Sequence, residues 1–301
     1  MLFDIRPALA AAWLSCVALV AGPCSAQERY SPFVPSEQVN VERMLRLAGI
    51  RDGDVIIDLG SGDGRIVLTA ARTNPTVRGI GVDLDEKLVE KANADAKAEG
   101  LADRVKFVHR NAFDADLSGV TVIAMWLWPE VQHMLRPKIF REARPGTRVI
   151  TNLFEIGSWP PDQTDKDGPQ VNMWLVPARV EGYWHWELPA GAAKRVYSAV
   201  MEQRFQTVEA FVRVGNRRGM ASDMKLRGED IAFSLSMTLE GSGYTRHEFT
   251  GRVLGDTIEG TVRISSPRED DETEVENKVL PWRAIRARES AYFAPTGTAA
   301  K

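Results

Sequence analysis

The chain has 301 residues, of which 44% are hydrophobic and 26% are charged, and its formal net charge is −3. These are ordinary globular values, and the length predicts one large domain or two modest ones. Because there is no basic excess, the composition gives no support for nucleic-acid binding, and we expect no nucleic-acid partner.

Residues 1–26 resemble an export signal. Arg6 precedes an apolar run over residues 7–22, and the segment ends in small residues up to Ala26. This order is typical of a secretory signal peptide cleaved after Ala26, and the run is too short and Ala-rich for a transmembrane helix. We therefore expect a periplasmic or secreted protein with no stable membrane span after cleavage. An uncleaved anchor or a misassigned start are the alternatives, giving a membrane-tethered or cytoplasmic protein.

Both cysteines, Cys16 and Cys24, lie within that segment. The mature chain would then contain none, which excludes structural disulfides, thiol catalysis and thiolate metal sites. The histidines are scattered without the spacing of metal ligands, so we expect no metal site.

Strand-like and helix-like segments alternate between residues 36 and 154. Apolar runs predict strands over Val55–Leu59, Arg78–Asp85, Arg104–Arg110, Val120–Trp126 and Gly146–Phe154. Amphipathic segments predict helices from Ser36 to Gly49, from about Gly64 to Arg72, and over Glu86–Gly100 and Pro129–Ala143. This alternation predicts right-handed crossovers and a parallel sheet with helices on both faces.

Beyond residue 171 alternating strand-like segments replace the helices, with turn residues such as Gly215-Asn216 between them. Short strands at about ten-residue spacing predict an antiparallel barrel or sandwich, whose inward residues we expect to form a core. The fold class is therefore α/β: a Rossmann-like, doubly wound, mostly parallel sheet (27–170), then a small antiparallel all-β domain (171–290) and a disordered tail (291–301).

Three segments near these boundaries are harder to place. Residues 162–168 (DQTDKDG) are expected to form a loop, and the acidic run over residues 269–276 a solvated hairpin tip. The segment VNMWLVPA, residues 171–178, either closes the first sheet or begins the second domain.

Gly60, Gly62 and Gly64 follow the first expected strand at alternate positions. Such a loop is either a tight turn or a ligand cradle, because glycines allow positive φ and close approach, and ligands bind at the carboxyl ends of parallel strands. Asp83 ends the next strand about twenty residues later, where a carboxylate suits a ribose diol.

Two acids distinguish this loop from a dinucleotide fingerprint. Asp58 precedes the glycines and Asp63 lies among them, so a pyrophosphate would be repelled, which disfavours a nicotinamide-dependent enzyme. A ligand with an ammonium and a sulfonium fits better, and Asp58 can bond the amino group of a methionine moiety.

The motifs DLGSGDG, GVDLD and VHRNAFDADL resemble those of class I S-adenosylmethionine-dependent methyltransferases, over about residues 32–162. The upstream segment PFVPSEQVNVERML is similar to small protein-lysine methyltransferases that modify mitochondrial inner-membrane proteins, and more distantly to Dot1 histone methyltransferases. The resemblance implies S-adenosyl-L-methionine as the cofactor. Its methionine part would be held by Asp58, Gly60, Ser61, Gly62 and Gly64, its ribose by Asp83, and its adenine by Leu84, Asn111 and Ala112. Asn111 replaces a usual Asp, but its amide oxygen is also an acceptor.

The implied activity is methyl transfer to an unidentified acceptor, either a protein, for example through a lysine amine, or a small molecule. The alternative is an exported binding module that keeps the cofactor fold without turnover. The loop MWLWPE after the fourth strand is where the superfamily places acceptor residues, and it lacks the Asn/Asp-Pro-Pro-Tyr motif of enzymes acting on nucleobases and glutamine. Trp126 and Trp128 are candidates for an aromatic wall around a lysine, although Trp128 is better explained by packing. Glu130 is a weak candidate base or an exposed helix residue, and the catalytic group is otherwise unassigned.

Overall fold

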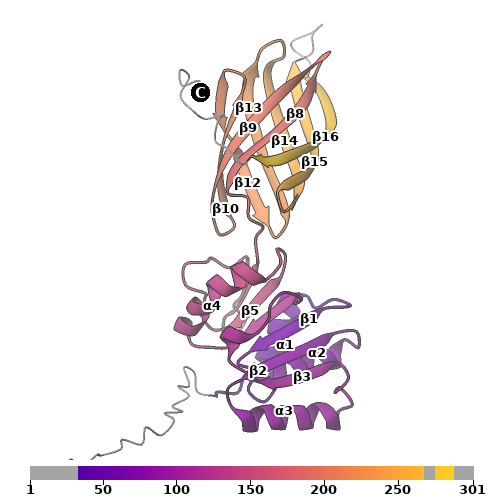
Figure 1. The fold of residues 1–301 in the computed structure, drawn as a ribbon, viewed down its shortest axis with the longest axis vertical. Coiled ribbons are helices and arrows are strands. Elements are labelled where there is room, and N and C mark those ends of the chain that lie inside the picture. Colours follow the sequence, from indigo (N-terminus) through magenta and orange to yellow (C-terminus); the bar gives the residue numbers. More distant parts are fainter. Residues whose placement is uncertain (1–32, 268–274, 288–301) are drawn as a thin grey trace, which may run out of the picture.

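The computed structural model describes residues 33–267 and 275–287, and its strands form two separate sheets (Figure 1). The first has seven strands in the order β3-β2-β1-β4-β5-β7-β6, and the second has nine. The expected signal peptide with its cleavage point after Ala26, most of the acidic hairpin tip and the tail over 291–301 lie outside the described residues.

Five parallel strands form the centre of the first sheet, as the sequence predicts. They are β1 (Val55–Leu59), β2 (Arg78–Asp83), β3 (Val105–His109), β4 (Val122–Met125) and β5 (Arg148–Asn152). All five residues of β5 are buried, and in β1 all but the first are, which is the burial expected of central parallel strands covered on both faces.

Helices cover both faces of this sheet, which confirms the doubly wound arrangement. On one face α1 (Gln38–Ala48), α2 (Arg65–Thr73) and α3 (Glu86–Ala98) pack on a cluster that includes Ile56 and Ile150. On the other, α4 (Pro129–Glu142) packs on a cluster that includes Ile57 and Val149. A short 3-10 helix, η1 (Ala112–Asp114), follows β3 on this second side.

Two antiparallel strands extend the sheet beyond β5. β7 (Val171–Leu175) pairs with β5, so the undecided segment closes the first sheet, and the predicted boundary at residue 170 falls inside that sheet. β6 (Gln163–Asp165) pairs with β7, so the expectation of a loop was wrong for these three residues. The side chain of Arg43 on α1 bonds the Asp165 carboxylate at 2.8 Å, and this ion pair fixes the short edge strand.

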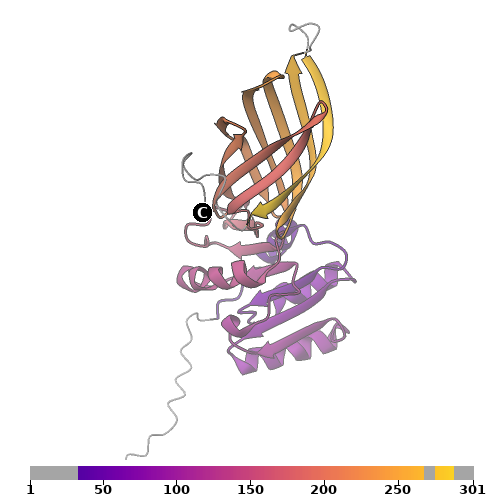
Figure 2. The same cartoon turned by 45° about the horizontal axis from the view of Figure 1, so that its top comes forward.

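The second sheet curls into a nearly closed antiparallel barrel (Figures 1 and 2). Its strands are β8 (Gly182–Ala190), β9 (Ala193–Arg204), β10 (Thr207–Val214), β11 (Arg217–Met220), β12 (Ser222–Arg227), β13 (Asp230–Leu239), β14 (Gly243–Leu254), β15 (Thr257–Pro267) and β16 (Val275–Ala287). The order β11-β10-β9-β8-β16-β15-β14-β13-β12 puts β11 and β12 at opposite edges, although Ala221 alone separates them in the chain. This one stretch therefore bridges the two edges, and it resolves the choice between barrel and sandwich.

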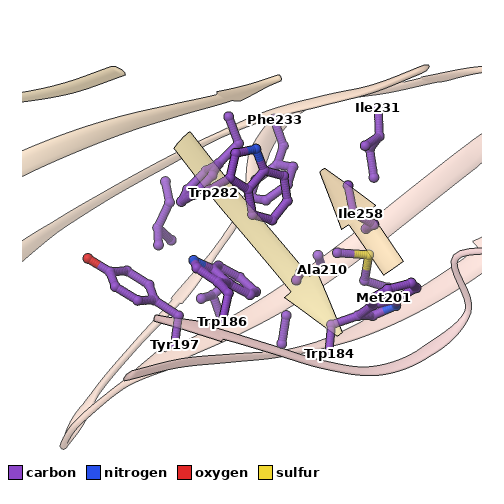
Figure 3. Close-up of a cluster of buried hydrophobic side chains, with 14 of the residues drawn as sticks. Trp184, Trp186, Tyr197, Met201, Ala210, Ile231, Phe233, Ile258 and Trp282 are labelled. Atoms are coloured by element: carbon purple, nitrogen blue, oxygen red, sulfur yellow. The ribbon is translucent and has the colours of Figure 1, made fainter. Parts of the chain in front are cut away.

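Aromatic side chains fill the barrel interior, which confirms that its inward residues form a core (Figure 3). The Trp186 ring stacks on Tyr197 at 5.4 Å between centroids and meets the edges of Phe249 and Trp282 at 5.5 and 5.6 Å. The buried Tyr197 hydroxyl also lies 2.9 Å from Nε2 of His247.

The tip of the β9–β10 hairpin joins the barrel to the first sheet. The Phe205 ring lies 5.8 Å from Phe140 of α4 and 6.3 Å from Trp159. Gln206 accepts a 3.0 Å hydrogen bond from the Trp159 indole and donates one of 2.7 Å to the Pro160 carbonyl. In the described part of the chain, no helix has the length and apolar character needed to cross a bilayer.

Candidate functional site

A pocket opens at the carboxyl edge of the first sheet. The loops after β1, β2, β3 and β4 line it, together with the segment before α1. Of the nine residues predicted to hold a cofactor, eight line this pocket: Asp58, Gly60, Ser61, Gly62, Asp83, Leu84, Asn111 and Ala112. The structure therefore brings together residues from separate loops that the sequence selected one by one.

The glycine loop has two different uses. Gly62 has φ 53°, and a Cβ there would lie 2.3 Å from the ring of Phe33, so glycine lets that ring pack over the loop. Gly64, the ninth predicted residue, does not line the pocket. It caps α2 with φ 82°, and a Cβ there would lie 2.5 Å from the Phe107 ring, so its role is helix–sheet packing.

Asp58 is a buried carboxylate with one oxygen left unpaired by the described residues. It is 1% exposed, and its Oδ1 has no hydrogen-bond partner among the described residues. Burial raises the pKa of Asp58 well above its usual value, and the neighbouring Asp83 and Asp63 carboxylates raise it further. An unpaired buried charge is strongly unfavourable, so the site suits a cationic group that would pair with it.

The hydroxyl of Ser61, in the loop after β1, is a second buried polar group that has no partner within the described residues. Together, Asp58 at the end of β1 and Ser61 in the loop bring an unsatisfied carboxylate oxygen and an unsatisfied hydroxyl to the pocket. The amino and carboxylate groups of a methionine moiety have the chemistry to satisfy both.

Asp83 shapes the glycine loop and also faces the pocket. Its Oδ2 accepts a 2.8 Å hydrogen bond from the Gly62 amide, and its Oδ1 accepts one of 2.8 Å from the Asp85 amide. Each carboxylate oxygen has a further lone pair, so both oxygens still have room to accept from ribose hydroxyls.

Asn111 has a structural use that the sequence did not suggest. Its Oδ1 accepts a 3.0 Å hydrogen bond from the Phe113 amide and so caps η1. The side chain also lines the pocket, where the amide can still offer a lone pair and N–H donors to an adenine edge.

The loop after β4 divides its candidate residues. Trp126 is partly buried and lines the pocket. Trp128 is 46% exposed and stacks on Phe154 with ring centroids 6.0 Å apart. Glu130 is exposed in the first turn of α4 and does not line the pocket, so the structure does not bring this candidate base to the site.

Asn152 is a polar residue of the site region that the sequence reasoning missed. It is 2% exposed, and its Oδ1 has no hydrogen-bond partner in the described part of the chain. The ladder pairs Met125 with Thr151, so Asn152 comes next to Trp126 at the carboxyl ends of β4 and β5. The sequence does contain a signal for this residue, because Asn152 is a polar residue at the end of the apolar strand β5.

Comparison with known proteins agrees with this geometry. The model of the ANTKMT methyltransferase domain matches residues 58–163. A protein-lysine N-methyltransferase of Saccharolobus islandicus (strain REY15A) is 38% identical over 135 residues, which cover 45% of this chain and 84% of the relative. The chain belongs to this family of S-adenosylmethionine-dependent methyltransferases.

Two further similarities involve the same half of the chain. The adenine nucleotide translocase lysine N-methyltransferase of Mus musculus is 32% identical over 161 residues, 49% of this chain and 69% of that protein. A solved structure of an RNA methyltransferase from Salinibacter ruber with S-adenosyl-L-homocysteine is 45% identical and covers 49% of this chain and 96% of its own, with a TM-score of 0.47. The family match ends at residue 163, before the barrel begins.

The residues of this pocket fit the cofactor of the family. The unsatisfied polar atoms of Asp58 and Ser61 would hold the methionine part, the acceptors of Asp83 would hold the ribose, and Asn111 would meet the adenine. S-adenosyl-L-methionine supplies an activated methyl group on a sulfonium. The protein therefore has to align the acceptor and exclude water, which loops on a rigid sheet can do.

Proposed function

We propose that this methyltransferase acts on a lysine side chain of a protein. The observation that carries the proposal is that the aromatic side chain of Trp126 lines the pocket. Trp126 lies near the glycine loop, because the next residue, Leu127, packs against Gly60. An aromatic face attracts an ammonium or methylammonium group. The names of the archaeal and mouse relatives, which describe lysine N-methyltransferases, support the same acceptor class.

The chain's own residues would then hold a neutral amine in line with the methyl group. The amine must lose its proton before it attacks, and water at the pocket mouth can take that proton. Trp126 would align the side chain, and the rings of Phe33 and Trp126 would limit the entry of further water.

Label transfer tests this proposal. The purified protein is incubated with methyl-tritiated S-adenosylmethionine and a cell-envelope extract, and labelled proteins are digested and sequenced by mass spectrometry. We expect mono-, di- or trimethyl-lysine in the labelled peptides, and much less label with the Asp83→Ala variant at the same low cofactor concentration. Label found only on glutamine, on carboxyl groups or on small molecules would contradict a lysine acceptor.

We also propose that the enzyme is exported, so that its acceptor lies outside the cytoplasm. The support is the composition of residues 1–26, with one arginine before an apolar run and small residues up to Ala26. Mass spectrometry of the protein purified from its native host should find an N-terminus at Gln27. A cytoplasmic protein that begins at Met1 would refute export and leave the acceptor proposal untouched.

A further inference from the structure

Four exposed apolar side chains come from segments that line or adjoin the pocket. Phe33 and Val34 line the pocket and are 45% and 56% exposed. Trp128 is 46% exposed and lies in the chain between the pocket-lining residues Leu127 and Val131. Leu153 follows β5 and is 47% exposed, and the ring of its neighbour Phe154 stacks on Trp128. We call Phe33, Val34, Trp128 and Leu153 the apolar rim.

The backbone holds one rim residue in an unfavourable conformation. Leu153 has φ 71°, a region that a leucine rarely adopts. Its amide donates a 2.6 Å hydrogen bond to the Gln170 carbonyl. The carbonyl of the next residue accepts 2.5 Å and 3.3 Å hydrogen bonds from Thr151 Oγ1 and Asn172 Nδ2. The surrounding strands therefore fix a turn that leaves the leucine side chain exposed, which internal packing does not explain.

The rim adjoins the reaction site. Phe33 and Val34 line the cofactor pocket, Trp126 lines it two residues before Trp128, and the four rim residues carry no charge. For a polypeptide whose lysine reaches the pocket, these side chains offer exposed apolar surface in the segments that line or adjoin it. Burying exposed apolar surface is favourable, whereas polar side chains laid over it would lose water contacts without gaining partners.

We infer that the apolar rim binds the residues that flank the target lysine, so that the enzyme selects acceptor segments with apolar side chains beside that lysine. This inference rests on the proposed lysine acceptor and adds the chemistry of its neighbours. The occupant is one polypeptide segment, entering with its lysine toward Trp126.

Two synthetic peptides test the inference directly. Both are nine residues long with blocked ends and one central lysine, flanked in one by leucine and valine and in the other by serine and glutamine. We expect kcat/KM for methyl transfer to be at least tenfold higher for the apolar peptide. Equal rates for the two peptides would overturn the inference while leaving the lysine acceptor intact. Failure to methylate either peptide, with S-adenosylhomocysteine still bound, would contradict both.

Variants locate the preference on the rim. Trp128→Ala and Leu153→Gly should each remove most of the tenfold preference, mainly through KM, without changing the Kd for S-adenosylhomocysteine. Leu153→Gly also relieves the positive φ, so its melting temperature should not fall, which separates binding from a structural role. Val39→Ala and Met134→Ala remove side chains of matching exposure, 56% and 47%, that lie outside the apolar rim, and they should keep the preference. A preference that survives both rim variants would overturn the inference.

Discussion

The first sheet and the barrel differ in what their interiors leave unsatisfied. At the carboxyl edge of the first sheet, one oxygen of a buried carboxylate (Asp58), a hydroxyl (Ser61) and an amide oxygen (Asn152) have no partner within the described residues. In the barrel, stacked and edge-on rings fill the interior around Trp186, and the unpaired polar atoms among the described residues are ring nitrogens, such as that of the Trp186 indole. The first sheet is therefore arranged to bind a ligand, and the interior of the barrel is arranged for stability.

The barrel core should therefore carry stability and not binding. Trp186→Ala removes a fully buried indole and should lower the free energy of unfolding of the barrel by about 3–5 kcal/mol. Chemical denaturation followed by tryptophan fluorescence measures the loss. The Kd for S-adenosylhomocysteine, measured below the unfolding transition, should stay within about twofold.

A matched control is Phe211→Ala, which removes a side chain that is 45% exposed on the outside of the barrel. Its effect should stay within about 0.5 kcal/mol, as for most surface substitutions. A large loss of cofactor affinity in Trp186→Ala would show that the barrel core contributes to binding, and not to stability alone.

Acidification should weaken the barrel through His247. Burial lowers the pKa of His247 to about 4, whereas an exposed histidine titrates near 6.5. As the pH falls from 6.5 to 4 the unfolded chain takes up this proton first, so stability falls across that window by up to about 3 kcal/mol.

The measurement is the unfolding free energy between pH 7 and pH 4, for the wild type and for His247→Gln. The glutamine variant does not titrate at this position, so its pH dependence should be smaller. Equal slopes in the two proteins would show that other groups control the acid sensitivity of the barrel.

A substitution at the pocket should instead weaken cofactor binding and leave the stability of the barrel unchanged. Asp83→Ala removes the acceptor for the Gly62 and Asp85 amides together with the predicted ribose contact. Cofactor affinity should fall about 100-fold, or about 2.7 kcal/mol, by calorimetry with S-adenosylhomocysteine. The unfolding transition of the barrel should not move, and an affinity within threefold of wild type would refute the ribose assignment.

Asp58 offers the smallest and sharpest test, because its two expected effects have opposite signs. Its raised pKa means that, as the pH rises, the unfolded chain releases this proton before the folded protein does, so the unliganded protein loses stability with rising pH. Asp58→Asn should raise the melting temperature at pH 8 while weakening S-adenosylhomocysteine about tenfold.

Asp58→Gln provides the control, since glutamine is also neutral but one carbon longer than asparagine. A lower melting temperature in both variants would show that the Asp58 carboxylate stabilises the unliganded fold. In that case the contrast between the first sheet and the barrel would no longer hold for this residue.

The sequence was sufficient for the parts of the fold that depend on local pattern. The apolar run Val55–Leu59 and the glycines after it predict the strand and its loop. The position of Asp83, about twenty residues after that loop, predicts that it ends the next strand. The place of Val171–Leu175 depends instead on which strand it meets, and the edge strand Gln163–Asp165 depends on the distant Arg43.

Alternation alone also could not distinguish a barrel from a sandwich, because both place every second side chain inward. The closure depends on the single residue between β11 and β12. At the site, the sequence selected Trp126 and Trp128 together. The stacking of Trp128 on Phe154 depends on the backbone turn after β5, which leaves no pattern in the sequence.

The hairpin tip at Phe205 has a practical consequence for anyone who wishes to study the catalytic half alone. Cutting the chain after residue 180 would strip Phe140 and Trp159 of the ring that covers them, and would free the Trp159 indole from Gln206. The shortened protein would expose an aromatic surface and would tend to aggregate. Replacing the partly buried Phe140 with a polar residue would be the first step toward a soluble fragment, because Trp159 also packs on Trp174 in the core.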